Sequence, residues 1–243
     1  TKVRIMNKLK TLVASVVVAT LSFGAANSFE IRAGLTGQSA AYYASVEETL
    51  KDSGVKHSDD ALAAFTYMSV FGEVAVDEAM GVSLGIEYSP DAITIDKANR
   101  TIHNTTSGEA QGNTATSNND AEGGVQDIQA EVKDLTLIYV GIPVMDTGLT
   151  FKAGYHMSTL QTQETLATGS TYGNKTVSGG TIGLYFDGEL GSNVFYRLEG
   201  AYQGFEEIKM NGSEEGVTDS GSFNEITAEL AGVQAKASVG FKF

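Results

Sequence analysis

Apolar and polar residues alternate with a period of two along most of the chain after residue 28. The clearest example is 81–89, GVSLGIEYS, in which every second residue from Val82 to Tyr88 is large and apolar. Successive side chains of a strand point to opposite faces, so this pattern predicts strands with one apolar and one polar face. About eight such segments are predicted, at 29–38, 64–76, 81–89, 128–144, 149–160, 176–190, 194–204 and 223–243.

The predicted connections alternate between short and long. Short turns are expected at 77–80, 145–148 and 191–193, and long polar loops at 46–60, 90–124, 167–175 and 205–221. The longest loop, about 90–124, is rich in Asn, Thr, Gly and Ala, which predicts a mobile segment. This rhythm is typical of transmembrane barrels, with turns on the periplasmic side and loops outside. We therefore expect an all-β fold, a transmembrane antiparallel up-and-down β-barrel of about eight strands that occupies 29–243.

In a transmembrane barrel the apolar faces meet lipid and the polar faces line the lumen. This assignment directs six acidic and five basic side chains into the lumen. They are Glu30, Arg32, Glu73, Glu87, Lys152, Asp187, Glu189, Arg197, Glu199, Lys236 and Lys242. Buried charges are costly unless paired, and side chains fill an eight-stranded barrel, so we expect an ion-pair network that plugs the interior. The alternative role for these residues is to line a narrow channel for small solutes.

The first 28 residues are predicted to be an export signal rather than part of the fold. A short basic region from Met6 precedes an apolar run at 12–23 and the small residues of 24–28. That run is shorter than the roughly 20 residues that a spanning helix needs. We therefore expect a cleaved signal peptide at 6–28, with 1–5 lying ahead of the expected initiator, Met6.

Composition narrows the range of functions. The chain has 16 Lys and Arg against 30 Asp and Glu, a net charge of −14, which argues against a nucleic-acid partner. Cysteine is absent, which excludes disulfides and thiolate metal sites. His57 and His103 lie in predicted loops without metal-ligand spacing. The sequence therefore predicts no metal and no cofactor, and it places much of the acidity in the predicted loops.

The last strand ends in a pattern that resembles the sorting signature of bacterial outer-membrane proteins. Val239, Phe241 and the final residue, Phe243, are apolar at every second position. The size and the loop rhythm also resemble the small barrels of the OmpA and OmpX type. This resemblance implies a location in the outer membrane of a Gram-negative-type bacterium, surrounded by lipid and lipopolysaccharide. It also implies that the barrel-assembly machinery reads the C-terminal strand.

A second, weaker resemblance concerns His156-Met157-Ser158, followed by Glu164. It is similar to the His-x-Ser element of barrel lipid A deacylases, in which a serine nucleophile needs a nearby histidine. Here the pair is predicted to face the lumen, whereas a deacylase must meet lipid, so no catalytic residue is assigned. We expect a structural or surface-interaction barrel that presents mobile acidic loops, with a narrow channel and a lipid-modifying enzyme as alternatives. A soluble lipocalin-like barrel is the alternative fold, and its polarity would be reversed.

Overall fold

The computed structural model describes residues 29–49, 56–75, 81–101, 125–145, 147–165, 171–213 and 225–243. The predicted signal peptide and the residues before it lie outside these ranges. In the described part of the chain no helix has the length and apolar character that a membrane crossing requires. The strands found there are β1 Glu30–Thr49, β2 Lys56–Ala75, β3 Ser83–Thr101, β4 Val125–Val144, β5 Leu149–Thr165, β6 Thr171–Tyr172, β7 Lys175–Glu189, β8 Val194–Phe205, β9 Ile208–Ser213 and β10 Glu225–Lys242.

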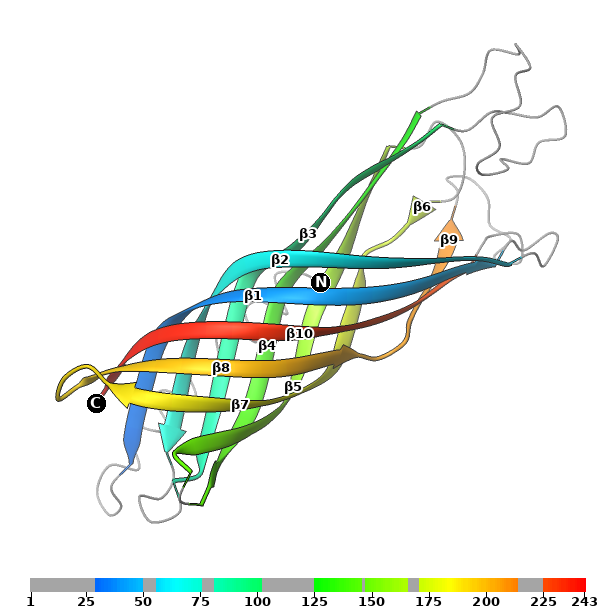
Figure 1. Cartoon of the computed structure of the whole chain (residues 1–243). Coiled ribbons are helices and arrows are strands. Elements are labelled where there is room, and N and C mark those ends of the chain that lie inside the picture. Colours follow the sequence, from blue (N-terminus) through cyan, green and yellow to red (C-terminus); the bar gives the residue numbers. More distant parts are fainter. Residues whose placement is uncertain are drawn as a thin grey trace, which may run out of the picture.

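Eight of these strands close into a barrel (Figure 1). Their order is β1-β2-β3-β4-β5-β7-β8-β10, each pair is antiparallel, and β10 pairs with β1. Short β9 pairs with the first residues of β10, Glu225 to Ala228, and β6 pairs with β9. Both short strands therefore lie at the end of the barrel that carries the long connections. The predicted closed, eight-stranded, up-and-down barrel is confirmed. Closure leaves no open sheet edge where β1 meets β10, which is what a sheet in lipid requires.

The register shows how strongly the strands are staggered. Following paired residues once around the barrel from Tyr43 leads back to β1 at Ala33, ten residues nearer its start. For eight strands this stagger corresponds to a tilt of roughly 40°, within the usual range for closed barrels. The stagger decides which side chains from distant strands meet at one level inside the barrel.

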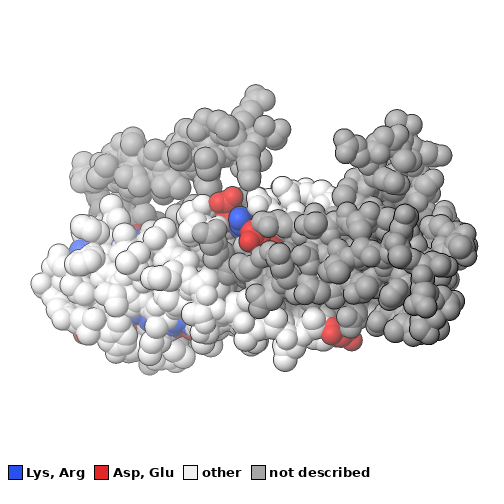
Figure 2. Space-filling model, turned by 90° about the horizontal axis from the view of Figure 1, so that it is seen from above, with Lys and Arg blue, Asp and Glu red and all other residues white. Residues whose placement is uncertain are grey.

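The distribution of apolar and charged side chains is inverted relative to a water-soluble protein. Leu198 and Phe241 are each 54% exposed on the outside, whereas Arg197 is 2% and Lys236 7% exposed on the inside. In Figure 2 most of the described surface facing the viewer is white, with a few scattered charged side chains. A soluble lipocalin-like barrel would bury the apolar residues and expose the charged ones, so that alternative is wrong. The barrel has the polarity of a membrane-spanning one.

Several strands are longer than the sequence predicts. β1 reaches Thr49 and β2 starts at Lys56, so most of the predicted loop 46–60 is strand. β3 continues to Thr101, so strand replaces the first third of the predicted loop 90–124, while 102–124 lie outside the described residues. A bilayer needs only about ten residues of a tilted strand, and these strands have 19 or 20. Exposed apolar side chains such as Leu35, Leu84 and Leu198 form an apolar belt around the outside of the barrel. Beyond this belt the strands become polar, so their extensions resemble loops in the sequence.

The fourth strand contains an irregularity that the sequence left ambiguous. Asp134 has a φ of 57°, and the pairing with β5 skips from Lys133 to Thr136, as in a β-bulge. After the bulge, Leu137 and Tyr139 face the interior, while Ile138 and Val140 face outward. Both faces of this stretch are apolar, so alternation alone did not determine its orientation.

Candidate functional site

The candidate site is the closed interior of the barrel, where charged side chains are stacked in layers. The lower layer lies near the short turns and centres on Arg197 of β8. Its Nη1 and Nη2 donate to the two oxygens of Glu73 of β2, at 2.9 and 3.1 Å. Its Nε donates to Asp187 Oδ1 of β7 at 2.7 Å. Arg32 of β1 donates to Asp187 Oδ2 at 3.0 Å and is also hydrogen-bonded to Glu30.

Aromatic rings enclose the Arg197 guanidinium group. Its Cζ lies 3.7 Å from the centroid of the Tyr185 ring and 5.3 Å from that of Phe71. Tyr139 Oη donates to Glu73 Oε2 at 2.9 Å. Cation–π contacts and charge-assisted hydrogen bonds are both favourable where water is excluded. This arrangement fixes the guanidinium in place rather than leaving it free to bind a solute.

The middle layer is a square of two acidic and two basic residues. Lys152 Nζ of β5 donates to Glu87 Oε2 at 3.1 Å and to both oxygens of Glu199, at 2.9 and 3.0 Å. Lys236 Nζ of β10 donates to the two oxygens of Glu87 at 2.9 and 3.1 Å. Ser69 Oγ adds a hydrogen bond to Glu87 Oε1 at 2.8 Å. The four charges sum to zero, which offsets part of the cost of their burial.

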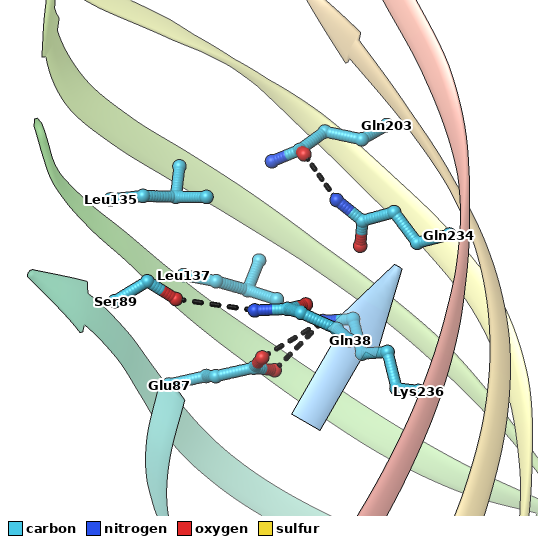
Figure 3. Close-up of a pocket in the computed structure, with 8 residues that line it drawn as sticks. All are labelled: Gln38, Glu87, Ser89, Leu135, Leu137, Gln203, Gln234 and Lys236. Atoms are coloured by element: carbon cyan, nitrogen blue, oxygen red, sulfur yellow. Dashed lines mark hydrogen bonds and ion pairs between the residues drawn. The ribbon is translucent and has the colours of Figure 1, made fainter. Parts of the chain in front are cut away.

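An uncharged polar layer covers the middle layer. Gln234 Nε2 donates to Gln203 Oε1 at 2.5 Å and to Tyr42 Oη at 2.7 Å. Gln38 Nε2 donates to Ser89 Oγ at 3.3 Å, as Figure 3 shows. The cavity among these side chains measures about 10 Å³, which is room for about one water molecule. Above this layer a small apolar cluster closes the interior, formed by Ala40, Tyr42, Tyr67, Val132 and Leu135.

Glycine residues in the wall make room for the large interior rings. A Cβ atom on Gly85 would collide with the Tyr139 ring, and one on Gly240 would lie 2.6 Å from the Phe195 ring. Because these two glycines have no side chain, the rings can lie flat against the wall beside the ion pairs. Part of the chain's high glycine content is therefore a packing requirement.

Most of the predicted lumen residues lie together, but two do not. Glu189 and Lys242 pair with each other at 3.0 Å at the rim, where the Glu189 side chain is 75% exposed. The assignment of Glu189 to the lumen network is therefore wrong. β7 ends at Glu189, so strand alternation no longer encloses its side chain. Glu30, at the start of β1, is only partly buried beside Arg32.

The predicted ion-pair network did not include the aromatic and amide side chains that complete the site. Tyr139 and Tyr185 are almost fully buried beside the ion pairs, and so are Gln203 and Gln234. A signal was present on β2, where Tyr67 and Phe71 share the alternation of Glu73. Aromatic residues separated by an even number of positions from a lumen-facing charged residue on the same strand are expected to face the lumen as well.

The His156 and Ser158 side chains are buried in the interior, as their predicted face requires. His156 Nδ1 lies 3.1 Å from Thr181 Oγ1, and its ring packs 4.5 Å from the Phe205 ring. His156 Nε2 and Ser158 Oγ have no hydrogen-bond partner within the described residues. A serine nucleophile requires a hydrogen bond from serine to histidine, and the two side chains do not form one here. The geometry does not support deacylase chemistry.

The residues of the C-terminal signature lie on the outer face of the closing strand. Val239, Phe241 and Phe243 are all exposed there. β10 pairs with β1 along its length, and the Phe243 amide donates to the Ile31 carbonyl at 2.9 Å. The signature therefore coincides with the seam at which the barrel closes.

Comparisons with known proteins give similarities of fold only. No protein-family profile matches the chain, and no curated protein matches its sequence. Among solved structures, the outer membrane protein OprG from Pseudomonas aeruginosa aligns with a TM-score of 0.49 at 11% identity, covering 90% of this chain and 96% of that one. The outer membrane protease OmpT from Escherichia coli aligns at 0.45 and 10% identity, covering 90% and 99%. The N-terminal barrel domain of Pseudomonas aeruginosa OprF aligns at 0.25 and 12% identity, covering 85% and 99%.

Proposed function

We propose that this protein is an integral outer-membrane barrel with a structural and surface-contact role. Its interior is closed, and its paired strands continue above the bilayer, where they can contact molecules outside the cell. The outer-membrane assignment rests on the closed barrel with inverted polarity and on the C-terminal pattern of Val239, Phe241 and Phe243. Assembly through that strand by the barrel-assembly machinery, and contact with lipopolysaccharide, belong to the same proposal.

The observation that carries the structural role is the filled interior. Two layers of paired charges, a layer of amides and tyrosines, and an apolar cluster succeed one another along the barrel. The charged groups bind one another, so they are not available to guide a passing ion. Side chains normally fill an interior of this strand number. A narrow channel for small solutes would need these pairs to separate.

The observation that favours surface contacts is the extension of β1 to β4 beyond the apolar belt (Figure 1). β9 and β6 add further strand pairing at that end. The connecting segments at this end, such as 214–224, contain several of the chain's acidic residues. Acidic segments suit partners with basic surfaces, or divalent cations that bridge to anionic lipid.

The orientation is testable by cysteine labelling, because the chain has no cysteine of its own. Asn211 is exposed on β9, and Gly191 is exposed in the short β7–β8 turn. A membrane-impermeant maleimide is expected to label Asn211→Cys on intact cells. It is expected to label Gly191→Cys only after the outer membrane is permeabilised. Labelling of Gly191→Cys on intact cells, with Asn211→Cys protected, would contradict the proposed orientation.

The closed interior predicts that the purified barrel does not conduct. In a planar bilayer at neutral pH we expect no single-channel steps, because breaking the layers means separating buried ion pairs. The measurement is current at fixed voltage, with a known porin inserted in the same bilayer as the positive control. Reproducible steps from the folded protein would instead support the narrow-channel alternative.

A further inference from the structure

A small cavity lies inside the barrel, between the middle layer of charges and the amide layer (Figure 3). Its volume is about 10 Å³, and side chains from β1, β3, β4, β8 and β10 border it. Leu135 and Leu137 close one side, whereas the other lining side chains are polar or charged. All of the polar ones are buried. The cavity is therefore a buried and largely polar space at the junction of two layers.

Gln38 of β1 brings a carbonyl oxygen without a partner to this cavity. Gln38 is only 3% exposed, and its Nε2 donates to Ser89 Oγ at 3.3 Å. Its Oε1 has no hydrogen-bond partner within the described residues. Exchanging the amide oxygen and nitrogen would transfer the unmet bond to the nitrogen, because the Ser89 hydroxyl can serve either atom. Buried polar atoms nearly always have a partner, so in either orientation this amide requires one more group.

Lys236 of β10 presents a donor to the same space. Its ammonium group has three N–H donors. Nζ lies 2.9 and 3.1 Å from the two oxygens of Glu87. The Glu199 oxygen is 3.7 Å from Nζ, which is beyond the range of a normal hydrogen bond. One N–H of Lys236 therefore lacks a close acceptor among the residues that the structure describes.

The lining decides which ligand suits the cavity. A molecule there must accept a hydrogen bond from Lys236 and donate one to Gln38 Oε1. Glu87 and Lys236 carry opposite charges, so an ion of either sign meets one group that repels it at short range. The volume is that of a single water molecule, and water both donates and accepts.

We propose that one water molecule is bound in this cavity and joins the charged layer to the amide layer. It accepts from Lys236 Nζ and donates to Gln38 Oε1. Its second hydrogen is left for the amide layer, where Gln203 and Gln234 carry acceptor oxygens. Buried waters typically make about three hydrogen bonds to polar groups that lack other partners. The proposal concerns the interior alone, so it does not depend on the outer-membrane location or on surface contacts.

Side chains block both ways out of the cavity. Below it lie the ion pairs of the middle and lower layers. Above it lie the hydrogen bond between Tyr42 and Gln203 and the apolar cluster. The water can leave only when one of these layers opens. We therefore expect it to stay longer than the rotational tumbling time of the barrel, which distinguishes it from surface hydration.

A crystal structure of the folded barrel, at a resolution that shows ordered waters, tests the site without any substitution. One density peak is expected in the cavity, about 2.7–3.2 Å from both Gln38 Oε1 and Lys236 Nζ. Well-ordered lining side chains without such a peak would overturn the proposal. Soaking the crystals in rubidium bromide distinguishes an ion from water, because both of its ions scatter anomalously. An anomalous peak in the cavity would overturn the assignment to water.

Magnetic relaxation dispersion of water oxygen-17 tests the site in solution, because its amplitude counts the long-lived waters of the barrel in detergent micelles. Gln38→Met removes the amide and keeps the length of the side chain. It is expected to lower the amplitude by the contribution of about one water. Gln161→Met is the matched control, since Gln161 lies near the loop end of β5 and outside the cavity lining. It is expected to leave the amplitude unchanged.

Folding of each variant is checked by heat-modifiable gel migration, in which a folded barrel migrates differently when the sample is not boiled. An amplitude that Gln38→Met leaves unchanged in a folded barrel would overturn the proposal. So would equal losses in the two variants, because the lost water would then not belong to this cavity. If Gln38→Met does not fold, the crystal structure of the unmodified barrel still decides between a bound water and a dry cavity.

Discussion

Replacing Lys152 by methionine is expected to destabilise the folded barrel by about 3–5 kcal/mol, the usual cost of leaving a buried charge without its partner. Lys152 Nζ contacts both Glu87 and Glu199, and its side chain is 1% exposed. Without it, Lys236 alone faces two carboxylates, and its distance to Glu199 is already 3.7 Å. The measurement is urea unfolding of the barrel from lipid vesicles, followed by far-ultraviolet circular dichroism.

The matched control is Lys242→Met, which removes the same kind of side chain from an exposed pair. Lys242 contacts Glu189 at the rim, so its loss is expected to cost less than about 1 kcal/mol. Combining Lys152→Met with Glu199→Gln restores neutrality in the middle layer. The double variant is expected to be more stable than the sum of the single changes predicts, by about 0.5–3 kcal/mol. Strictly additive changes would show that the four charges do not act as one unit.

Replacing Leu198 by arginine is expected to destabilise the barrel by about 2–4 kcal/mol, the cost of a cationic side chain near the bilayer midplane. Leu198 points outward on β8, midway between Val194 at the turn end and Tyr202 at the upper edge of the belt. The charge would have to enter hydrocarbon or thin the bilayer locally. Unfolding from lipid vesicles measures the effect, as for Lys152.

Leu190 provides the control for this substitution. It is also exposed, at 62%, but it lies in the turn between β7 and β8, outside the apolar belt. Leu190→Arg is therefore expected to change the stability by at most about 1 kcal/mol. A water-soluble barrel would tolerate both arginines about equally, because exposed substitutions usually have small effects. Equal effects in lipid would contradict the membrane-spanning interpretation.

The sequence was sufficient to predict the strand number, the inverted polarity and, on most strands, the residues on each face. Alternation with period two depends only on the backbone geometry of a strand, so local sequence carries it. The positions of Ile86, Glu87 and Phe241 illustrate this, since each has the predicted face. Alternation failed in 135–144, where both faces are apolar and a bulge at Asp134 shifts the register. It also failed beyond the belt, where β1, β2 and β3 become polar while they remain paired.

The pairing partners of the buried charges could not be predicted from sequence. Arg197 and Glu73 are 124 residues apart on strands that are not neighbours, and they meet across the interior. Their common level is set by the ten-residue stagger of the closed barrel, which depends on all eight registers at once. The sequence placed Glu189 in the same group as Arg197, and only the end of β7 shows that it lies at the rim.

On most strands, the amino-acid sequence by itself determined which side chains face lipid and which face the interior, because that choice is made residue by residue along each strand. The tertiary structure alone decided which charges neutralise one another and where the interior leaves a cavity. Gln38 and Gln203 border one cavity only because the registers of β1 with β10 and of β10 with β8 bring them to a common level. Closure of the barrel fixes these neighbours, and no local pattern encodes the level at which distant strands meet.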